Sequence, residues 1–481
     1  MQPSVAVLVT LVIYQALLLG LGYWARSRAQ TLEGYFIGGR SLGPWVTALS
    51  YAAGSSSAWS ILGVSGIAFS QGVSAFWLLP GTLTGHLVVW FWIAPKLQTL
   101  SHQHRWVTLT DMLAHQLPHK YASLTYRLSA IVILFSFTFY IAAQFQGAAN
   151  TFTAVFDVSF LVALLLGAGV VLVYTLWGGF WAVSITDAVQ AALMLVAALV
   201  LPLAAWLAVG GLEGLNKAGE IPQGGFWVWS GGHEGWFGTG FMLGMLSIGF
   251  GPLGQPHLLN RVMAMARKND IKLARMVALS WFVLVLSGMF VLGLCAHVLL
   301  VKPQPAEQVF FQMADNLLPT IVTGVLVAAV LSAIMSTADS QLLVAGAAVD
   351  NDLRKARQRP GQTSRYSSRI AVFSVAVAAV VLAWVLPDSI FSRVLFAWNA
   401  LGAGFGPLVI ARLLGWQNQP WSIPTAISVG FGLTVLFYSL PDGPGDLWER
   451  AVPFLLAMLL LVFTRRTVGS VQVNAASPGS G

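Results

Sequence analysis

Apolar runs of 17 residues or more recur along almost the whole chain, separated by short stretches of charged and turn-forming residues. An α-helix needs about 20 apolar residues to cross a bilayer. Of the 481 residues, 57% are hydrophobic and only 9% are charged, whereas soluble proteins have about 25% charged residues. An ordinary soluble protein is therefore excluded, and we predict an all-α integral membrane protein.

The runs predict about thirteen transmembrane helices within a single transmembrane domain, residues 1–466. Segments 97–123 and 211–236 are too polar to span, and the small polar tail 467–481 is expected to be a disordered cytoplasmic segment. The expected spans are 4–24, 44–70, 74–94, 124–152, 159–177, 186–209, 238–258, 272–300, 318–346, 368–386, 390–411, 421–440 and 448–464.

Loop charges give the orientation. With these spans, 21 of the 25 Lys and Arg residues fall on one side, and the other side holds only Lys217, Lys302, Arg393 and Arg450. Cytoplasmic loops are enriched in Lys and Arg, so we expect the N-terminus outside and the C-terminus in the cytoplasm. The net charge of +8 then reports orientation and gives no reason to expect a nucleic-acid partner.

Two of the expected spans contain residues that weaken a helix near mid-bilayer. In the second span, residues 52–58 read AAGSSSA. Glycine releases helical restraint and serine competes for backbone hydrogen bonds. The seventh span is interrupted by glycines and prolines, namely Gly244, Gly249, Gly251, Pro252, Gly254 and Pro256. Close helix packing by small residues is the alternative explanation, less favoured for either segment alone and still less for the two together.

The two interruptions lie five spans apart, each in the first helix of a five-helix set. Broken helices in matching positions of two halves are typical of secondary transporters built from inverted repeats, with a binding site at the midplane. We therefore expect repeats at 44–209 and 238–411. Freed amides around Gly54, Ser55, Ser56 and Ser57 are suited to binding a substrate carboxylate.

The ninth span adds oxygen ligands. Ser336 and Thr337 are adjacent hydroxyls, and Ala333 lies one turn earlier, so its carbonyl and both hydroxyls can converge. Backbone carbonyls of Ala53 and Ser56 complete five oxygens, which suits a hard cation such as sodium. A lone Ser-Thr pair more often bonds back to its own helix, and that alternative stays open.

Ionisable residues in the spans are functional candidates. Asp187 fits an ion pathway or an acid near a helix start equally well, and Asp339 fits an exit role better than direct ligation. Four histidines in 97–123 lack Cys or Glu at ligand spacing. They favour a solvated amphipathic helix, and no metal other than sodium is expected.

The sequence resembles the sodium/solute symporter family, and within it the bacterial sodium/proline symporters. The resemblance covers nearly the whole chain. It rests on the blocks 34–43 (GYFIGGRSLG), 177–180 (WGGF), 186–187 (TD), 254–257 (GQPH), 335–341 (MSTADSQ) and 397–407 (AWNALGAGFGP).

The resemblance implies a ten-helix inverted-repeat core, of the leucine-transporter type, with extra helices at both ends. It implies sodium ligation by carbonyls of Ala53, Ser56 and Ala333 and hydroxyls of Ser336 and Thr337. It also implies that Asp187 lies on the inward sodium path and that Tyr140 borders the substrate.

Two departures affect the expected substrate. The proline symporters carry an aspartate where this chain has Ser55, which puts sodium affinity in doubt. They also use aromatic side chains where Ile248 and Pro252 stand here, which puts proline in doubt. The predicted substrate-binding set is Gly54, Ser55, Ser57, Tyr140, Ile248 and Pro252.

Together these observations predict a sodium-coupled symporter of the cell inner membrane that imports a small organic solute by alternating access, with an amino acid such as proline as the leading class. The expected partners are the solute, sodium as coupling ion and the lipid bilayer, with no other cofactor. The alternatives are a sodium- or proton-coupled importer of a monocarboxylate or another solute, and a solute sensor that does not transport. An enzyme is not expected, because no nucleophile, metal or acid/base group converges in the spans.

Overall fold

The computed structural model describes residues 5–25, 31–156, 158–218, 226–300, 305–357, 365–385, 390–441 and 443–466. Within these ranges the chain is helical, and β pairing is confined to the isolated bridges Leu42–Met265 and Asn418–Arg465. The predicted tail 467–481 lies outside the described residues.

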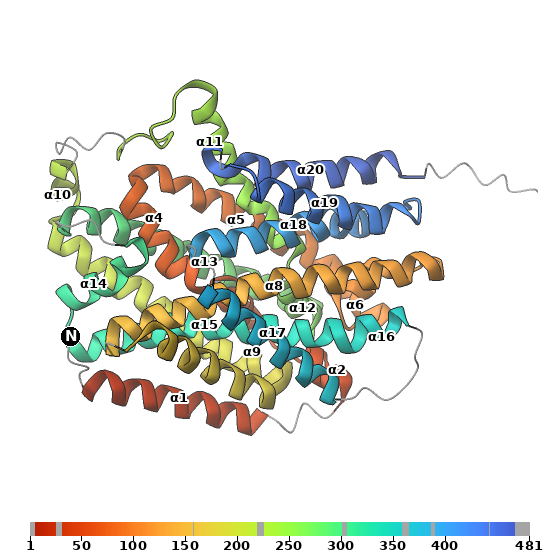
Figure 1. The fold of residues 1–481 in the computed structure, drawn as a ribbon, viewed down its shortest axis with the longest axis horizontal. Coiled ribbons are helices and arrows are strands. Elements are labelled where there is room, and N and C mark those ends of the chain that lie inside the picture. Colours follow the sequence, from red (N-terminus) through yellow and green to blue (C-terminus); the bar gives the residue numbers. More distant parts are fainter. Residues whose placement is uncertain are drawn as a thin grey trace, which may run out of the picture.

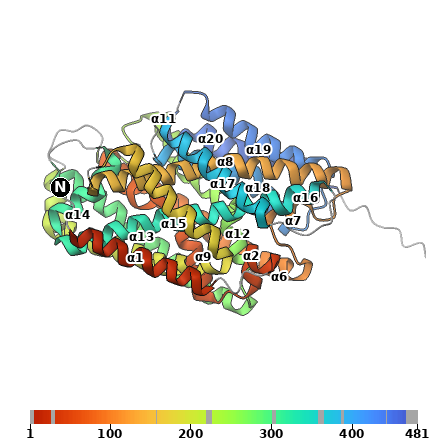
Figure 2. The same cartoon turned by 60° about the horizontal axis from the view of Figure 1, so that its bottom comes forward.

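Most of the long helices run along one axis (Figures 1 and 2). The α-helices are α1 (Val5–Ala25), α2 (Leu32–Ile37), α3 (Pro44–Ser55), α4 (Val64–Gln71), α5 (Leu78–Val88), α6 (Ala94–His104), α7 (Leu109–Ala114), α8 (His119–Phe156), α9 (Phe160–Val209), α10 (Gly211–Ala218), α11 (Gly235–Ser247), α12 (Pro256–Met263), α13 (Ile271–Leu299), α14 (Val309–Leu317), α15 (Thr320–Ala347), α16 (Leu353–Ala356), α17 (Arg365–Val385), α18 (Ile390–Leu413), α19 (Ser422–Tyr438) and α20 (Leu447–Phe463). Short 3-10 and π segments join several of them, including η3 (Trp59–Gly63), η5 (Val89–Ile93), η6 (Ile248–Gly254) and η9 (Ala348–Asp352).

Eight helical stretches of the described chain are long and apolar enough to cross a bilayer, and three shorter helices are also apolar. They overlap the ranges expected from the sequence, so the all-α, multi-pass membrane fold is confirmed. The number thirteen stays a prediction, because some expected spans coincide with helices of fewer than 18 residues, such as α20 (Leu447–Phe463) with 17.

The first interruption is narrower than the sequence predicts. Helix α3 continues through Ser55, and helical geometry is lost at Ser56, with φ −98° and ψ 7°. A π-helical segment, η3, follows before α4 begins at Val64. Helix α3 persists through Ser55 because its residues are packed inside the bundle: every residue from Ser50 to Ser55 is buried.

The second interruption separates α11 from α12. The tight 3-10 segment η6 leads to Gln255, which is extended, with φ −78° and ψ 109°. Pro256 then occupies the first turn of α12, where its missing N–H is no loss. A third break divides α9 at Gly179, whose φ of 64° lies in the left-handed region that glycine accepts readily.

Glycines let the segment η6 approach its neighbours closely. A Cβ atom on Gly249 would lie 2.3 Å from the carbonyl oxygen of Gly81, and one on Gly85 would lie 2.2 Å from that of Gly249. A Cβ on Gly254 would lie 2.4 Å from the oxygen of Leu401 in α18. The second break is therefore clamped between α5 and α18.

The sequence predicts a solvated amphipathic helix in the polar segment 97–123, and this prediction is wrong. Helix α6 extends to His104, α7 is short, and α8 begins at His119. All residues of α7 are buried. A capping box explains where α7 starts: the Thr108 hydroxyl accepts from the Asp111 amide, and the Asp111 carboxylate accepts from the Thr108 amide.

Candidate functional site

Hydroxyls of α15 meet the end of α3 inside the bundle. The Ser336 hydroxyl lies 3.2 Å from the carbonyl oxygens of both Ala53 and Ala333. The Thr337 hydroxyl lies 3.2 Å from the oxygen of Gly54 and 3.5 Å from that of Ala53. Both side chains are fully buried. In this arrangement the hydroxyls donate to the carbonyls.

The spacing of these oxygens suits one small cation. A hard cation that holds oxygens at about 2.3–2.6 Å places neighbouring oxygens of an octahedron about 3.3–3.7 Å apart. The contacts of Ser336 and Thr337 with the carbonyls fall at 3.2–3.5 Å. A cation entering here would turn the hydroxyl protons away and use the oxygen lone pairs. Ser56 touches the group through its amide, which donates to Ala53 at 3.0 Å.

Asp187 lies on the side of α3 that carries Ser50, and it is paired with an arginine. Arg261 of α12 donates to the Asp187 carboxylate at 2.7 Å. It also donates to the Ser50 hydroxyl at 2.6 Å and to the Ser340 hydroxyl. Asp187 is 0% exposed and Arg261 is 1% exposed. Charges buried this deeply need a partner, and these two are each other's.

Arg261 links the first break to the proposed path for the ion. A Cβ atom on Gly54 would lie 3.4 Å from its guanidinium. Arg261 therefore covers the break from the side on which Asp187 lies, and it holds α3, α9, α12 and α15 together. Sequence reasoning missed this residue, because Arg261 sits among other loop arginines and gives no sign of burial.

Ser55 faces a histidine. The Ser55 hydroxyl lies 3.4 Å from Nε2 of His86 in α5, and the Tyr51 hydroxyl lies 3.0 Å from Nδ1. The imidazole is stacked on the ring of Phe282, with a centroid distance of 3.8 Å and an angle of 12°. Both ring nitrogens thus have partners, and His86 is a buried residue with its hydrogen-bonding capacity used inside the protein.

Other side chains bind the backbone freed at the break. Gln144 of α8 accepts from the amide of Ala58 at 3.0 Å. Nε2 of His257 donates to the oxygen of Gly54 at 3.2 Å. The amide of Ala58 is thus already bonded, and so is that of Ser56, which the sequence suggested for a solute, because it donates to the oxygen of Ala53.

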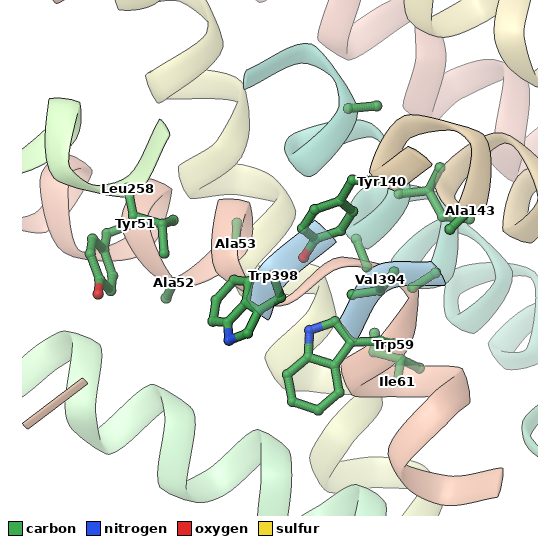
Figure 3. Packing of buried hydrophobic residues seen from close by; sticks show 14 of the residues in the cluster. Tyr51, Ala52, Ala53, Trp59, Ile61, Tyr140, Ala143, Leu258, Val394 and Trp398 are labelled. Atoms are coloured by element: carbon green, nitrogen blue, oxygen red, sulfur yellow. The ribbon is translucent and has the colours of Figure 1, made fainter. Parts of the chain in front are cut away.

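Tyr140 lies beside the break, together with an aromatic ring that the sequence analysis did not single out. The Tyr140 hydroxyl donates to Ser57 at 3.4 Å. Its ring centroid is 6.5 Å from that of Trp398 in α18, at an angle of 69° (Figure 3). Both rings are almost completely buried. Aromatic rings in edge-to-face contact offer an apolar surface against which another apolar ring can pack.

Trp398 also contacts the second break. Its indole N–H donates to the oxygen of Ile248 at 3.1 Å. A Cβ atom on Gly251 would lie 1.7 Å from that nitrogen. The indole therefore lies against η6, the segment that holds Ile248 and Pro252. Helix α18 thus brings an aromatic ring to the segment in which this chain has Ile248 and Pro252.

The predicted solute residues form an enclosed group. The side chains of Ser55, Ser57, Tyr140, Ile248 and Trp398 are each no more than 1% exposed. Pro252 and Gly54 are buried as well. Within the described chain these side chains are thus shielded from solvent.

Known proteins resemble this chain over most of its length. The family model described as the sodium:solute symporter family matches residues 35–417. The high-affinity proline transporter PutP of Bacillus subtilis strain 168 is 33% identical over 92% of this chain and 94% of its own length. The sodium/proline symporter of Escherichia coli K12 is 32% identical, with 91% and 88% covered.

Solved structures show the same fold at low identity. A sodium-coupled sialic acid symporter in its substrate-bound outward-open state superposes with a TM-score of 0.79 at 14% identity, covering 95% of this chain and 97% of that one. The nucleobase-cation-symport-1 family transporter Mhp1 reaches a TM-score of 0.55 at 13% identity, covering 90% and 95%.

Proposed function

The chain belongs to the sodium:solute symporter family, and on that premise we propose that it imports proline together with sodium across the cell inner membrane. The proline transporters that resemble it share about a third of its residues over almost its full length. The observation that carries the ion part is the convergence of Ser336 and Thr337 on the carbonyls at the break in α3.

Sodium is assigned to the oxygens of Ala53, Ser56, Ala333, Ser336 and Thr337. The arrangement suits it because carbonyls and neutral hydroxyls bind a hard cation without forming a permanent ion pair. Three of these residues come from α15 and two from the end of α3. Binding therefore ties the two helices together, which couples occupancy of the ion site to the shape of the break.

Asp187 is assigned to the inward path of the ion. In the closed arrangement its carboxylate is held by Arg261 and Ser50. When the inner side opens, movement of α12 separates Arg261 from Asp187 and exposes a carboxylate below the sodium oxygens. A cation leaving the site then meets a negative charge on its way to the cytoplasm.

The solute is assigned to the space bordered by Gly54, Ser55, Ser57, Tyr140, Ile248 and Pro252, with Trp398 added by the structure. The hydroxyls of Ser57 and Tyr140 are suited to a carboxylate, and the rings of Tyr140 and Trp398 to an apolar ring. A pyrrolidine carboxylate has both features. Breaks in both repeats, 44–209 and 238–411, border this space.

Sodium entry supplies the driving force. Moving one positive charge inward gains about 2.3 kcal/mol per 100 mV, which corresponds to about fiftyfold solute accumulation. The sodium gradient adds to this value. The proposed orientation places the N-terminus outside and the C-terminus in the cytoplasm.

Uptake of labelled proline into proteoliposomes tests the ion site. The double variant Ser336→Ala with Thr337→Ala should raise the sodium concentration for half-maximal uptake at least tenfold, because each lost partner of a buried charge costs about 1–3 kcal/mol. Thr323→Ala serves as the control, since this hydroxyl lies in the same helix near its start, where it contacts Ala314 and Pro319. An unchanged sodium requirement in the double variant would refute the assignment.

Competition by unlabelled solutes tests the substrate. Ile248 and Pro252 stand where the proline symporters have aromatic residues, so a monocarboxylate is the second candidate. Proline should compete better than acetate, lactate or a sugar, and Trp398→Leu should weaken proline more than it weakens a monocarboxylate. Stronger competition by a monocarboxylate in the unmodified protein would replace proline as the substrate and leave the sodium site standing.

A further inference from the structure

A cavity lies at the end of the bundle where α6 ends and α7 begins, away from the proposed transport site. Its volume is about 540 Å³. The end of α6, the loop after α7 and the turn after α18 form its walls. Figure 2 shows α7, α16 and α6 at this end of the molecule, opposite α14. Lys and Arg are concentrated in the loops at this end, which the charge pattern predicts to be cytoplasmic.

The cavity is basic. Arg412, Arg466, His104 and His115 all line it, and its described lining contains no Asp or Glu. Burial lowers the pKa of His115, and the neighbouring His104 and Arg412 lower it further. Two guanidinium groups thus share this cavity without an acidic group in its described lining, and the lowered pKa keeps the His115 imidazole neutral at neutral pH.

Two donors of the cavity have unused hydrogen-bonding capacity. Nε2 of His115 and Nε of Arg412 are buried, and neither has a hydrogen-bond partner among the described residues. The other end of the Arg412 guanidinium is fixed, because it donates to the oxygen of Leu113 at 2.8 Å. Buried polar atoms without partners are rare and costly. Both residues line the cavity, and small side-chain movements that brought these nitrogens to a ligand oxygen there would give each a partner.

The aromatic lining fits the membrane interface. His104 is stacked on Trp106, with a centroid distance of 5.0 Å and an angle of 25°. Trp416 also lines the cavity. Tryptophans are enriched at the level of lipid headgroups. Basic pockets between helices on this side of a membrane are suited to phosphate headgroups.

We propose that this cavity binds a phosphate group, carried either by the headgroup of an anionic phospholipid or by a soluble phosphate compound. Arg412 and Arg466 supply guanidinium forks, which bind phosphate oxygens in pairs. His115 supplies a further donor from the α7 side. A bound phosphate joins α7 to the end of α18, the helix that carries Trp398 into the transport site.

Native mass spectrometry of the purified full chain tests the lipid source. The protein is exchanged into micelles with either phosphatidylglycerol or phosphatidylcholine. We expect one phosphatidylglycerol to be retained in preference to phosphatidylcholine, and Arg466→Gln to lower its retention at least tenfold. Arg465→Gln is the matched control, because the neighbouring guanidinium lies on Trp416 and does not line the cavity.

Thermal unfolding in lipid-free detergent tests the soluble source. Inorganic phosphate should raise the melting temperature of the unmodified chain and of Arg465→Gln relative to chloride at equal ionic strength. The increase should be absent in Arg412→Gln and in Arg466→Gln. Arg466 is exposed, and its hydrogen bonds to the described residues are to Gln419 and, through its backbone amide, to the oxygen of Gln417, so Arg466→Gln should fold normally.

Site-specific binding of either phosphate source supports the proposal and identifies the source. Equal losses in Arg465→Gln and Arg466→Gln would show general attraction to surface charge and would overturn it. Failure of both phosphatidylglycerol and inorganic phosphate to bind the unmodified chain would overturn it as well. Uptake of proline is not part of either measurement, so the result is independent of the proposed transport function.

Discussion

Buried charge is the strongest constraint on single residues in this molecule. Arg261 and Asp187 are both within 1% of complete burial and lie 2.7 Å apart. Such a pair contributes little net stability, but removing one partner leaves an uncompensated charge in the interior. The ion pair therefore holds α12 against α9, and we expect it to separate only when both groups gain new partners.

Neutralising the two charges separately and together tests whether this ion pair holds the helices together. Arg261→Gln or Asp187→Asn alone should each destabilise the protein by about 3–5 kcal/mol, whereas the double variant should lose clearly less than their sum. Thermal unfolding of the purified protein measures the difference, with exposed Arg267→Gln as control. Strictly additive losses would show that the two residues act independently.

The resemblance implies an aspartate where this chain has Ser55, and the effect of that difference is best tested together with His86. An aspartate at position 55 would stand beside the imidazole, since the serine oxygen is 3.4 Å from Nε2. Ser55→Asp alone should therefore pair with His86 and leave the sodium requirement nearly unchanged. Ser55→Asp combined with His86→Leu should lower the sodium concentration for half-maximal uptake severalfold, because the freed carboxylate attracts the cation. A strong effect of Ser55→Asp alone would contradict this account.

The residues of the candidate site differ in how far the sequence reveals them. Ser336 and Thr337 could be found because they are adjacent in one apolar helix. His86 and Ser55 are 31 positions apart, Arg261 and Asp187 are 74 apart, and Trp398 and Ile248 are 150 apart. Their contacts exist only once helices from different parts of the chain are packed. Such long-range contacts cannot be predicted from composition or from local sequence patterns.

At the scale of elements, the interrupted helices follow from glycine, serine and proline, but their extent does not. The sequence indicates a weak region at 52–58, whereas helical geometry is lost at Ser56. Tertiary contacts decide the difference, because Gln144 and Ser57 satisfy the amides of Ala58 and Trp59 and allow the helix to resume at once. Local helix propensity indicates where an interruption costs little free energy, and tertiary packing decides how many residues lose helical geometry.

The contact between η6 and α18 gives a prediction at this scale. Gly251→Ala should impair folding and uptake, because the added methyl would lie 1.7 Å from the Trp398 indole nitrogen. Trp398→Leu in the same chain should restore much of the thermal stability while leaving proline uptake low. Gly240→Ala in α11 is the control, since a Cβ there meets no atom within 4 Å. A Gly251→Ala protein with normal stability and uptake would mean that the indole moves aside freely.

At the scale of the whole molecule, the orientation in the membrane rests on charge alone. Helices α6 and α16 lie at one end of the bundle and α14 at the other (Figures 1 and 2), and the excess of Lys and Arg lies in the loops at the end with α6 and α16. Positive loops are retained in the cytoplasm during insertion. The direction of sodium and solute movement in the proposed mechanism depends on this assignment.

Cysteine accessibility decides the orientation. The native Cys295 is completely buried, so Cys295→Ala provides a background free of thiols, in which Glu234→Cys and Gln103→Cys each place one thiol at an exposed position. A membrane-impermeant maleimide should label Glu234→Cys in intact cells and Gln103→Cys only after permeabilisation, while proline uptake confirms that both variants are folded. The reverse pattern would place the Arg-rich loops outside. Inward sodium movement would then run from the Asp187 side toward Ser336, opposite to the proposed exit, and the phosphate cavity would face away from the cytoplasm.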